Sequence, residues 1–182
     1  MRMHNALGTL TAAVMVALAA PVPAQAQAPP TPGPTPGAAQ MIVGTWTMVG
    51  AQTQAVDGSG EITYPRGIRP SGYIIYDENG MMYVQIMNGD EMRPPKTGPR
   101  QLSPEEQAKA FSSYTAYFGT YTIDEEKGTV VHDPQANTNP RLVGDARTRF
   151  LEITPDTLEL NTFNMSDDGV ERITRRMWER AN

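Results

Sequence analysis

The stretch Met41–Gly50, MIVGTWTMVG, decides the fold that we predict for this chain. It is a β-prone run directly after a Pro-rich segment, and it contains the triplet Gly44-Thr45-Trp46. Trp46 is one of only two tryptophans, and the other, Trp178, lies close to the C-terminus. A tryptophan near each end indicates that the first and last strands lie side by side, as a closed barrel requires.

The clearest hairpin signal is SGYIIYDENGMMYVQIMNGD, residues 71–90. Two apolar runs flank Asn79-Gly80, the pair preferred in two-residue hairpin turns. A turn of that length pairs Tyr76 with Tyr83. The more apolar face of the hairpin then holds five candidate ligand-binding residues: Tyr73, Ile75, Met82, Val84 and Ile86. The sequence leaves open which face lines a cavity.

One amphipathic helix is predicted in the middle of the chain. Ser103-Pro104-Glu105-Glu106 combines an N-cap serine, a proline at the first helical position and a capping glutamate. The apolar spacing extends this helix over residues 104–118. A helix that lies over the open end of a barrel would bring Tyr114 and Tyr117 close to its mouth, where both phenols are candidates to bind the polar end of a ligand.

The N-terminal residues have the composition of a targeting segment. An apolar run and the small-X-small site Ala24-Gln25-Ala26 predict a signal peptide over residues 1–26, and hence an exported protein, periplasmic or secreted. The run is too short for a transmembrane helix. Residues 27–40 are rich in Pro, Gly, Thr and Ala and predict a linker. The remaining residues, 41–182, are the size of one domain.

Composition excludes several classes of partner. The chain has no cysteine, so neither a disulfide nor a lipid-anchored cysteine is available. Fifteen basic residues, one of them Arg2 in the predicted signal peptide, stand against 20 acidic ones. Without a basic run, nucleic acid is not an expected partner. We found no metal-ligand spacing and no phosphate or dinucleotide motif, so neither a metal nor a cofactor is expected.

Four segments in order resemble the lipocalin-like domain family of bacteria and fungi. They are Val43-Gly44-Thr45-Trp46, GYIIYDENGMMYVQ at residues 72–85, YTAYFGTY at residues 114–121, and Trp178-Glu179-Arg180. Together with the short strands and local turns of the chain, the resemblance implies an all-β fold. We expect an up-and-down antiparallel calycin barrel of about eight strands, with the one helix mid-chain. In such barrels the tryptophan of the first motif seals the closed end. Gly44 and Trp46 would take that place here, beneath Arg176 or Arg180.

Three function classes remain open at this stage. The first is an exported carrier that binds a small lipophilic molecule in the barrel cavity. The second is a small cofactor-free enzyme of the isomerase or cyclase type, for which His132 or a tyrosine would supply the acid or base. The third is an envelope interaction module with a filled barrel. We expect His132 to be exposed at a strand end and the tyrosines to fill core and rim, which favours a non-enzymatic role.

Overall fold

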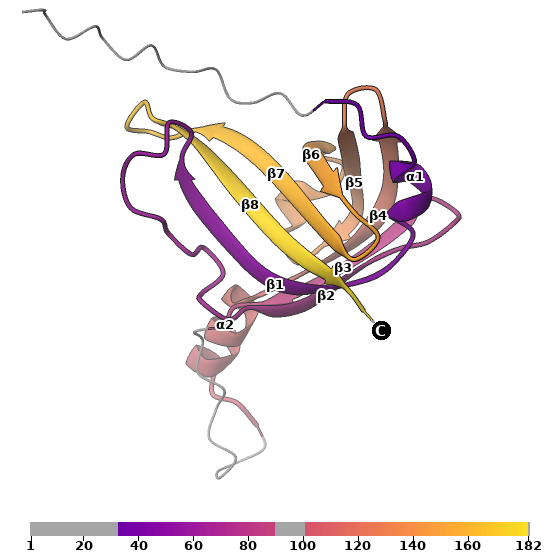
Figure 1. Ribbon diagram of the computed structural model, residues 1–182. Coiled ribbons are helices and arrows are strands. Elements are labelled where there is room, and N and C mark those ends of the chain that lie inside the picture. The colour runs from indigo at the N-terminus through magenta and orange to yellow at the C-terminus, as the bar shows by residue number, and fades with distance from the viewer. Residues whose placement is uncertain (1–32, 90–100, 182) are drawn as a thin grey trace, which may run out of the picture.

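The computed structural model of the protein describes residues 33–89 and 101–181 (Figure 1). Its strands form a closed barrel in which each strand pairs antiparallel with the next and the last pairs with the first. The strands are β1 (Gly44–Ala55), β2 (Ser71–Tyr76), β3 (Met81–Met87), β4 (Tyr114–Asp124), β5 (Thr129–Asn137), β6 (Arg147–Ile153), β7 (Thr157–Met165) and β8 (Glu171–Arg180). The helical elements are α1 (Ala38–Met41), α2 (Pro104–Ser112) and the 3₁₀ turn η1 (Pro140–Leu142). The predicted up-and-down β-barrel is confirmed.

The two tryptophans lie on the neighbouring strands that close the barrel. Trp46 pairs with Arg180, and Met48 pairs with Trp178, in the β1–β8 ladder. Both indole rings are buried in the core. The predicted contact between the first and last strands is therefore confirmed.

One end of the barrel, which we call the closed end, is sealed around Trp46. Its indole N–H donates a hydrogen bond of 2.8 Å to the Ile42 carbonyl, and the Arg180 guanidinium carbon lies 4.1 Å from the ring centroid. Arg180 also donates to the carbonyls of Met41 and Val43. Gly44 has a φ of 130° here, and a Cβ at this position would lie 2.9 Å from the Arg180 guanidinium. The Gly-X-Trp motif therefore serves a tight cation–π packing of Arg180 on Trp46.

Part of the predicted linker packs on the barrel. α1 covers the closed end, where Ala38 and Ile42 are fully buried. The Glu125 carboxylate, in the β4–β5 turn, accepts hydrogen bonds from the Gly37 and Ala39 amides. The folded domain thus begins before Met41. The predicted signal peptide, residues 1–26, and residues 27–32 of the linker lie outside the described residues.

The register of the β2–β3 hairpin differs from the prediction by one residue. Tyr76 pairs with Met82, and Ile75 with Tyr83, because the loop contains three residues instead of two. The Asp77 amide bonds to the Met81 carbonyl, and the Asp77 carboxylate accepts from the Asn79 and Met81 amides. A shift of one residue in one strand exchanges its two faces. Tyr73 and Ile75 consequently lie on the outside of the barrel, 53% and 38% exposed, while Met82, Val84 and Ile86 are buried.

The mid-chain helix has the predicted start and a different end. The capping box of Ser103 and Glu106 is present, but α2 ends at Ser112 and β4 begins at Tyr114. Pairing of residues 114–120 with β3 outweighs the helical spacing of their apolar side chains. α2 contains no buried residue, and Phe111 is 62% exposed. In Figure 1 the helix projects from the barrel, so the helix over the open end that the sequence suggested is not observed.

Candidate functional site

A cavity of about 140 Å³ lies inside the barrel toward the end opposite α1. One part of its wall is apolar and is formed by Ile74, Ile86, Pro134, Leu142, Leu160 and Trp178. The other part is polar and is formed by Arg66, Thr115, Tyr117, His132, Asn137, Arg147, Arg149 and Arg176. A concave space with an apolar wall and a few convergent polar groups is the usual form of a small-molecule site.

A larger hollow of about 660 Å³ lies near the closed end, between Gly33–Thr35 and the strands β6 to β8. Much of its rim consists of exposed residues such as Glu152, Thr154 and Thr157. Its charged lining residues are carboxylates, and no arginine, lysine or histidine is among them. The smaller interior cavity is therefore the candidate site.

Four arginines reach the cavity from three parts of the fold. Arg147 and Arg149 are two residues apart on β6, so both side chains point to the same face of the sheet. Arg176 lies on β8 opposite Leu160 of β7, and Arg66 comes from the β1–β2 connection. The barrel closure is what places these distant residues around one space.

The hydrogen bonds of three of these arginines go to neutral oxygens. Arg66 donates to Thr115 Oγ1 at 2.9 Å, and Arg176 donates to Thr162 Oγ1 at 3.3 Å. Arg149 donates to the Arg147 carbonyl at 3.3 Å. Among the described residues only Arg147 of the four has a carboxylate partner, Asp145. Positive charge inside the cavity is thus largely uncompensated.

Burial and the neighbouring arginines lower the pKa of Arg176. Burial is the main cause that lowers the pKa of Arg176 to about 10, and the neighbouring charges of Arg149, Arg66 and Arg147 lower it further in the same direction. Burial also lowers the pKa of Arg66. Arg176 remains charged at neutral pH, but its charge is held at a cost in free energy.

His132 lies at the centre of a buried network of aromatic side chains. It is 1% exposed, with its Nε2 atom 2.7 Å from the Tyr76 hydroxyl and its Nδ1 atom 3.3 Å from the Tyr117 hydroxyl. Burial is the main cause that lowers its pKa well below the usual value, and the charges of Arg149 and Arg176 add to the effect. A neutral imidazole has one donor and one acceptor nitrogen, so it satisfies both phenols at once.

The predicted exposure of His132 is wrong because β5 runs further than its sequence indicates. Pro134 and the polar residues after it predict a strand end at His132, but the strand continues to Asn137. The register of the β4–β5 ladder shifts between Phe118 and Gly119, where Gln135 of β5 is the extra, bulged residue next to Pro134. A bulge is where a sheet accepts a proline, which has no amide hydrogen to donate.

A profile of the lipocalin-like domain matches residues 43–181. The chain belongs to the lipocalin-like domain family. No curated protein matches it. Among solved structures it is similar in fold to bovine odorant-binding protein in complex with a selenium-containing odorant, with 10% sequence identity and a TM-score of 0.38. That similarity covers 79% of this chain and 73% of the bovine chain.

The cavity of this lipocalin-like domain includes two of the seven predicted ligand-binding residues, Ile86 and Tyr117. Met82 and Val84 are buried in the core of the barrel. Tyr73 and Ile75 lie on the outer face. Tyr114 pairs across the ladder with Met87, which is on the outer face, and it precedes Thr115, which lines the cavity. Because side chains alternate along a strand, Tyr114 points outward as well.

Of the two arginines predicted for the closed end, Arg180 covers Trp46, whereas Arg176 lines the cavity. The arginines of the cavity were not predicted as a group. The one local signal for the cluster was Arg147-X-Arg149 at the start of a strand, since alternate positions of a strand share a face. Arg66 gives no such signal, because it belongs to an irregular connection.

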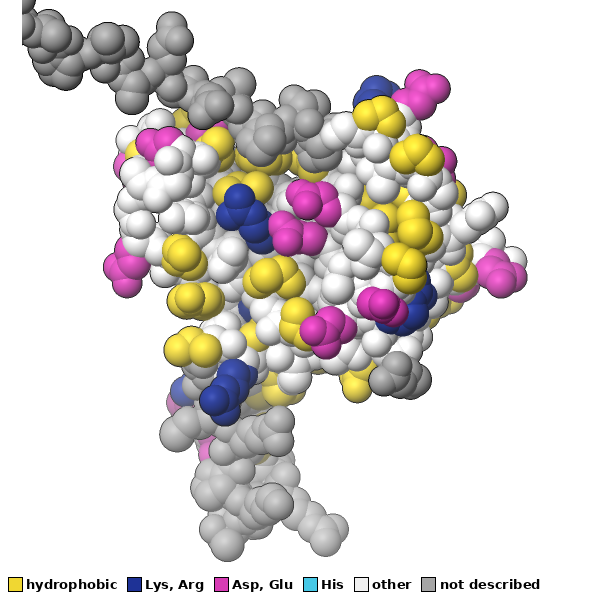
Figure 2. Space-filling model, viewed as in Figure 1, with side chains coloured by type: hydrophobic (Ala, Val, Ile, Leu, Met, Phe, Trp, Pro, Cys, Tyr) yellow, Lys and Arg dark blue, Asp and Glu magenta, His cyan; other side chains and the backbone are white. Residues whose placement is uncertain are grey.

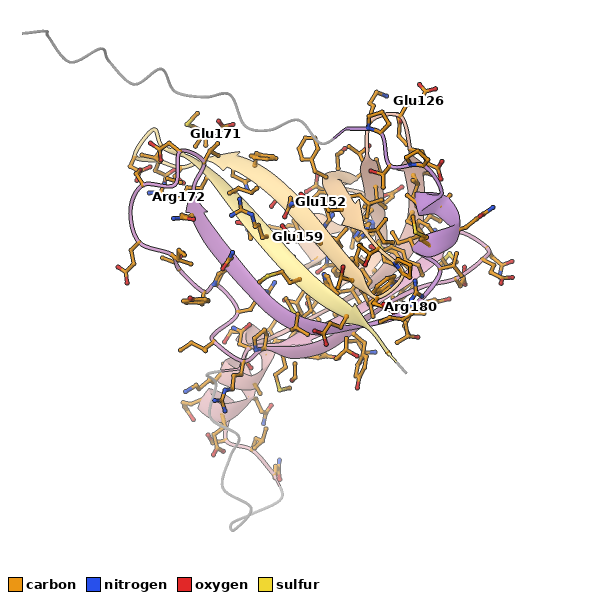
Figure 3. All side chains as sticks on the ribbon, in the orientation of Figure 1. Glu126, Glu152, Glu159, Glu171, Arg172 and Arg180 are labelled. Atoms are coloured by element: carbon orange, nitrogen blue, oxygen red, sulfur yellow. The ribbon has the colours of Figure 1, made fainter. Side chains whose placement is uncertain are left out.

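Acidic side chains gather on the outside of the same barrel. Glu152 and Glu159 are paired on adjacent strands, and Figure 3 shows both on the outer side of the sheet. Figure 2 shows Asp and Glu side chains spread over this face. The lipocalin-like domain therefore holds several arginines around its inner cavity and carries carboxylates such as Glu152 and Glu159 on its outer face.

Within the described ranges, no cluster of three or more His, Asp or Glu side chains is arranged to hold a metal ion. The helices described there are too short or too polar to cross a bilayer.

Proposed function

We propose that this lipocalin-like domain binds a small molecule in the barrel cavity and acts as a carrier. The observation that carries the proposal is the partly enclosed space of about 140 Å³ with an apolar wall and converging polar groups. A cavity of about 150 Å³ is large enough to hold benzene. The cavity accommodates the apolar body of a ligand against Ile86 and Leu160 and a polar group on the opposite side.

The two alternative functions have less support. A filled-barrel interaction module does not need a cavity with charged side chains inside it. An enzyme that uses His132 as a general base needs a nitrogen that is free to take a proton at neutral pH. In His132 both nitrogens contact phenols, and the pKa is far below the usual range. The lipophilic carrier of the sequence prediction thus becomes a carrier for a ligand with one apolar and one polar side.

Filling the cavity should weaken ligand binding. Ile86 lines the cavity and is buried, so the substitution Ile86→Trp adds an indole where the ligand body would lie. We expect a loss of affinity of roughly tenfold or more for benzamide and benzoate, measured by saturation-transfer NMR, because a bulky side chain competes for the same volume.

The matched control is Tyr83→Trp, on the same strand and on the outer face. It should bind the same probes as the wild type does. If none of the small aromatic probes binds the wild-type protein, or if Ile86→Trp binds them unchanged while folded, the carrier proposal fails.

We also propose that the protein is exported. The support is the apolar run followed by Ala24-Gln25-Ala26, a pattern typical of signal peptides. N-terminal sequencing of the protein from its native host should give a mature chain that begins at Gln27. A mature chain that retains Met1 would contradict export through a cleaved signal.

A further inference from the structure

The polar side of the cavity wall is dominated by hydrogen-bond donors. Arg66, Arg149 and Arg176 enter it from a loop and two strands, and their present acceptors are two threonine hydroxyls, an asparagine amide oxygen and one backbone carbonyl. A guanidinium has five N–H donors, so each of the three has donors left over. No residue of the described cavity wall is an Asp or a Glu.

Trp178 adds an unused donor to the same wall. The side chain lines the cavity and is 2% exposed, and its indole N–H has no acceptor among the described residues. A buried polar group without a partner costs free energy and calls for an explanation. An oxygen atom of a bound ligand could accept the hydrogen bond that the Trp178 indole N–H does not make within the described residues.

Several like charges in a partly buried space destabilise the protein when no ligand is bound. Burial and the neighbouring cations lower the pKa of Arg176 to about 10, which reflects this cost. Such a cost persists in a protein where the charges bind a ligand of opposite sign. The cations do not belong to a basic outer surface, because the outside carries Glu152 and Glu159 on neighbouring strands.

We infer that the ligand is a small organic anion whose carboxylate is held by Arg66, Arg149 and Arg176 and whose apolar body packs on Ile86, Leu160 and Trp178. This inference rests on the proposed carrier function and defines its ligand class. The planar guanidinium matches a carboxylate with two parallel hydrogen bonds, which favours this anion over a spherical one. The volume of about 140 Å³ suits a single ring or a short chain.

Three probes of one shape separate charge from size. Benzoate is anionic, benzamide is neutral and benzamidine is cationic, while ring and dimensions are shared. We expect titration calorimetry in a low-chloride buffer at neutral pH to show benzoate bound roughly tenfold or more tightly than benzamide, because hydrogen bonds to charged groups are the stronger ones. Benzamidine should not bind. Inorganic phosphate should bind more weakly than benzoate, since it does not use the apolar wall.

The variant that tests the assignment is Arg176→Met, which keeps an unbranched, flexible side chain and removes the guanidinium and its charge. The expected loss of benzoate affinity is roughly tenfold or more, with benzamide affinity unchanged. The matched control is Arg175→Met, one residue away on β8, where the side chain lies 3.6 Å from Glu159. The control should bind benzoate as the wild type does.

A second readout keeps the test valid if the variants differ in stability. Because removal of one cation relieves repulsion in the cavity, Arg176→Met should melt at the same temperature as the wild type or higher in the absence of anion. Benzoate should raise the melting temperature of the wild type and of Arg175→Met, and not that of Arg176→Met.

The outcomes distinguish the anion inference from the carrier proposal. If benzamide binds as tightly as benzoate, or phosphate binds as tightly as benzoate, the cavity does not select an organic anion and the inference is wrong while the carrier proposal stands. If Arg176→Met binds benzoate normally, the arginines do not hold the carboxylate. If no probe binds, the carrier proposal fails as well.

Discussion

Replacing Trp46 by alanine is expected to lower the free energy of unfolding by about 3–5 kcal/mol, the usual cost of truncating a fully buried large aromatic side chain. The indole ring is completely buried, and Trp46→Ala also removes the hydrogen bond to the Ile42 carbonyl. The Arg180 guanidinium would lose the ring over which it lies. Urea unfolding followed by circular dichroism measures the change, since the second tryptophan keeps fluorescence from being a clean reporter.

The matched control for Trp46→Ala is Tyr73→Ala on the adjacent strand. Tyr73 pairs with Thr47, one residue away from Trp46 in the ladder, and lies on the outer face. Its removal should change stability by no more than about 0.5 kcal/mol, as is usual for surface positions. A loss below about 1 kcal/mol for Trp46→Ala would show that the closed end does not depend on the indole.

The barrel could be predicted from the sequence because its signals are local. β-prone runs with turn residues between them, the Gly-X-Trp motif and the capping box of α2 each depend on a few neighbouring residues. Closure followed from the positions of Trp46 and Trp178, one on each end strand. These features needed no knowledge of side-chain contacts.

The hairpin faces could not be predicted, because a single hydrogen-bonding side chain decides the loop length. Asn79-Gly80 favours a two-residue turn, but the Asp77 carboxylate binds two backbone amides and makes a three-residue loop. Each strand alternates with a period of two, so this one-residue difference moved Tyr73 and Ile75 to the outer surface.

The arginine cluster could not be predicted for a different reason. Arg66, Arg149 and Arg176 are far apart in the sequence, and they meet only because the sheet closes. Charged residues on strands usually face solvent, so their inward direction has no local signature. The same holds for His132, whose burial depends on the bulge at Gln135 that lets β5 continue past Pro134.

Acid should destabilise the protein through His132. In the unfolded chain a histidine titrates near pH 6.5, whereas in the native barrel burial and the charges of Arg149 and Arg176 hold the pKa of His132 well below that value. Between the two values the unfolded state binds a proton that the native state does not. The stability that His132 contributes is therefore fully present above about pH 6.5 and falls by about 1.4 kcal/mol for each pH unit below it, until the native pKa is reached.

The measurement is urea unfolding of the wild type and of His132→Gln at pH 7.5 and at pH 5. We expect the wild type to lose up to about 2 kcal/mol more than the variant over this interval, because glutamine does not titrate. The lower limit of pH 5 stays above the usual range of aspartate titration, so the ion pair of Asp168 with Arg172 does not contribute. A protonated His132 has two donor nitrogens, and both phenols must then accept, so the phenol that donates to the neutral imidazole loses the acceptor of its hydroxyl hydrogen. Equal pH dependence in the two proteins would mean that His132 takes up its proton in the folded barrel without cost, and the closed network of Tyr76, His132 and Tyr117 would be wrong.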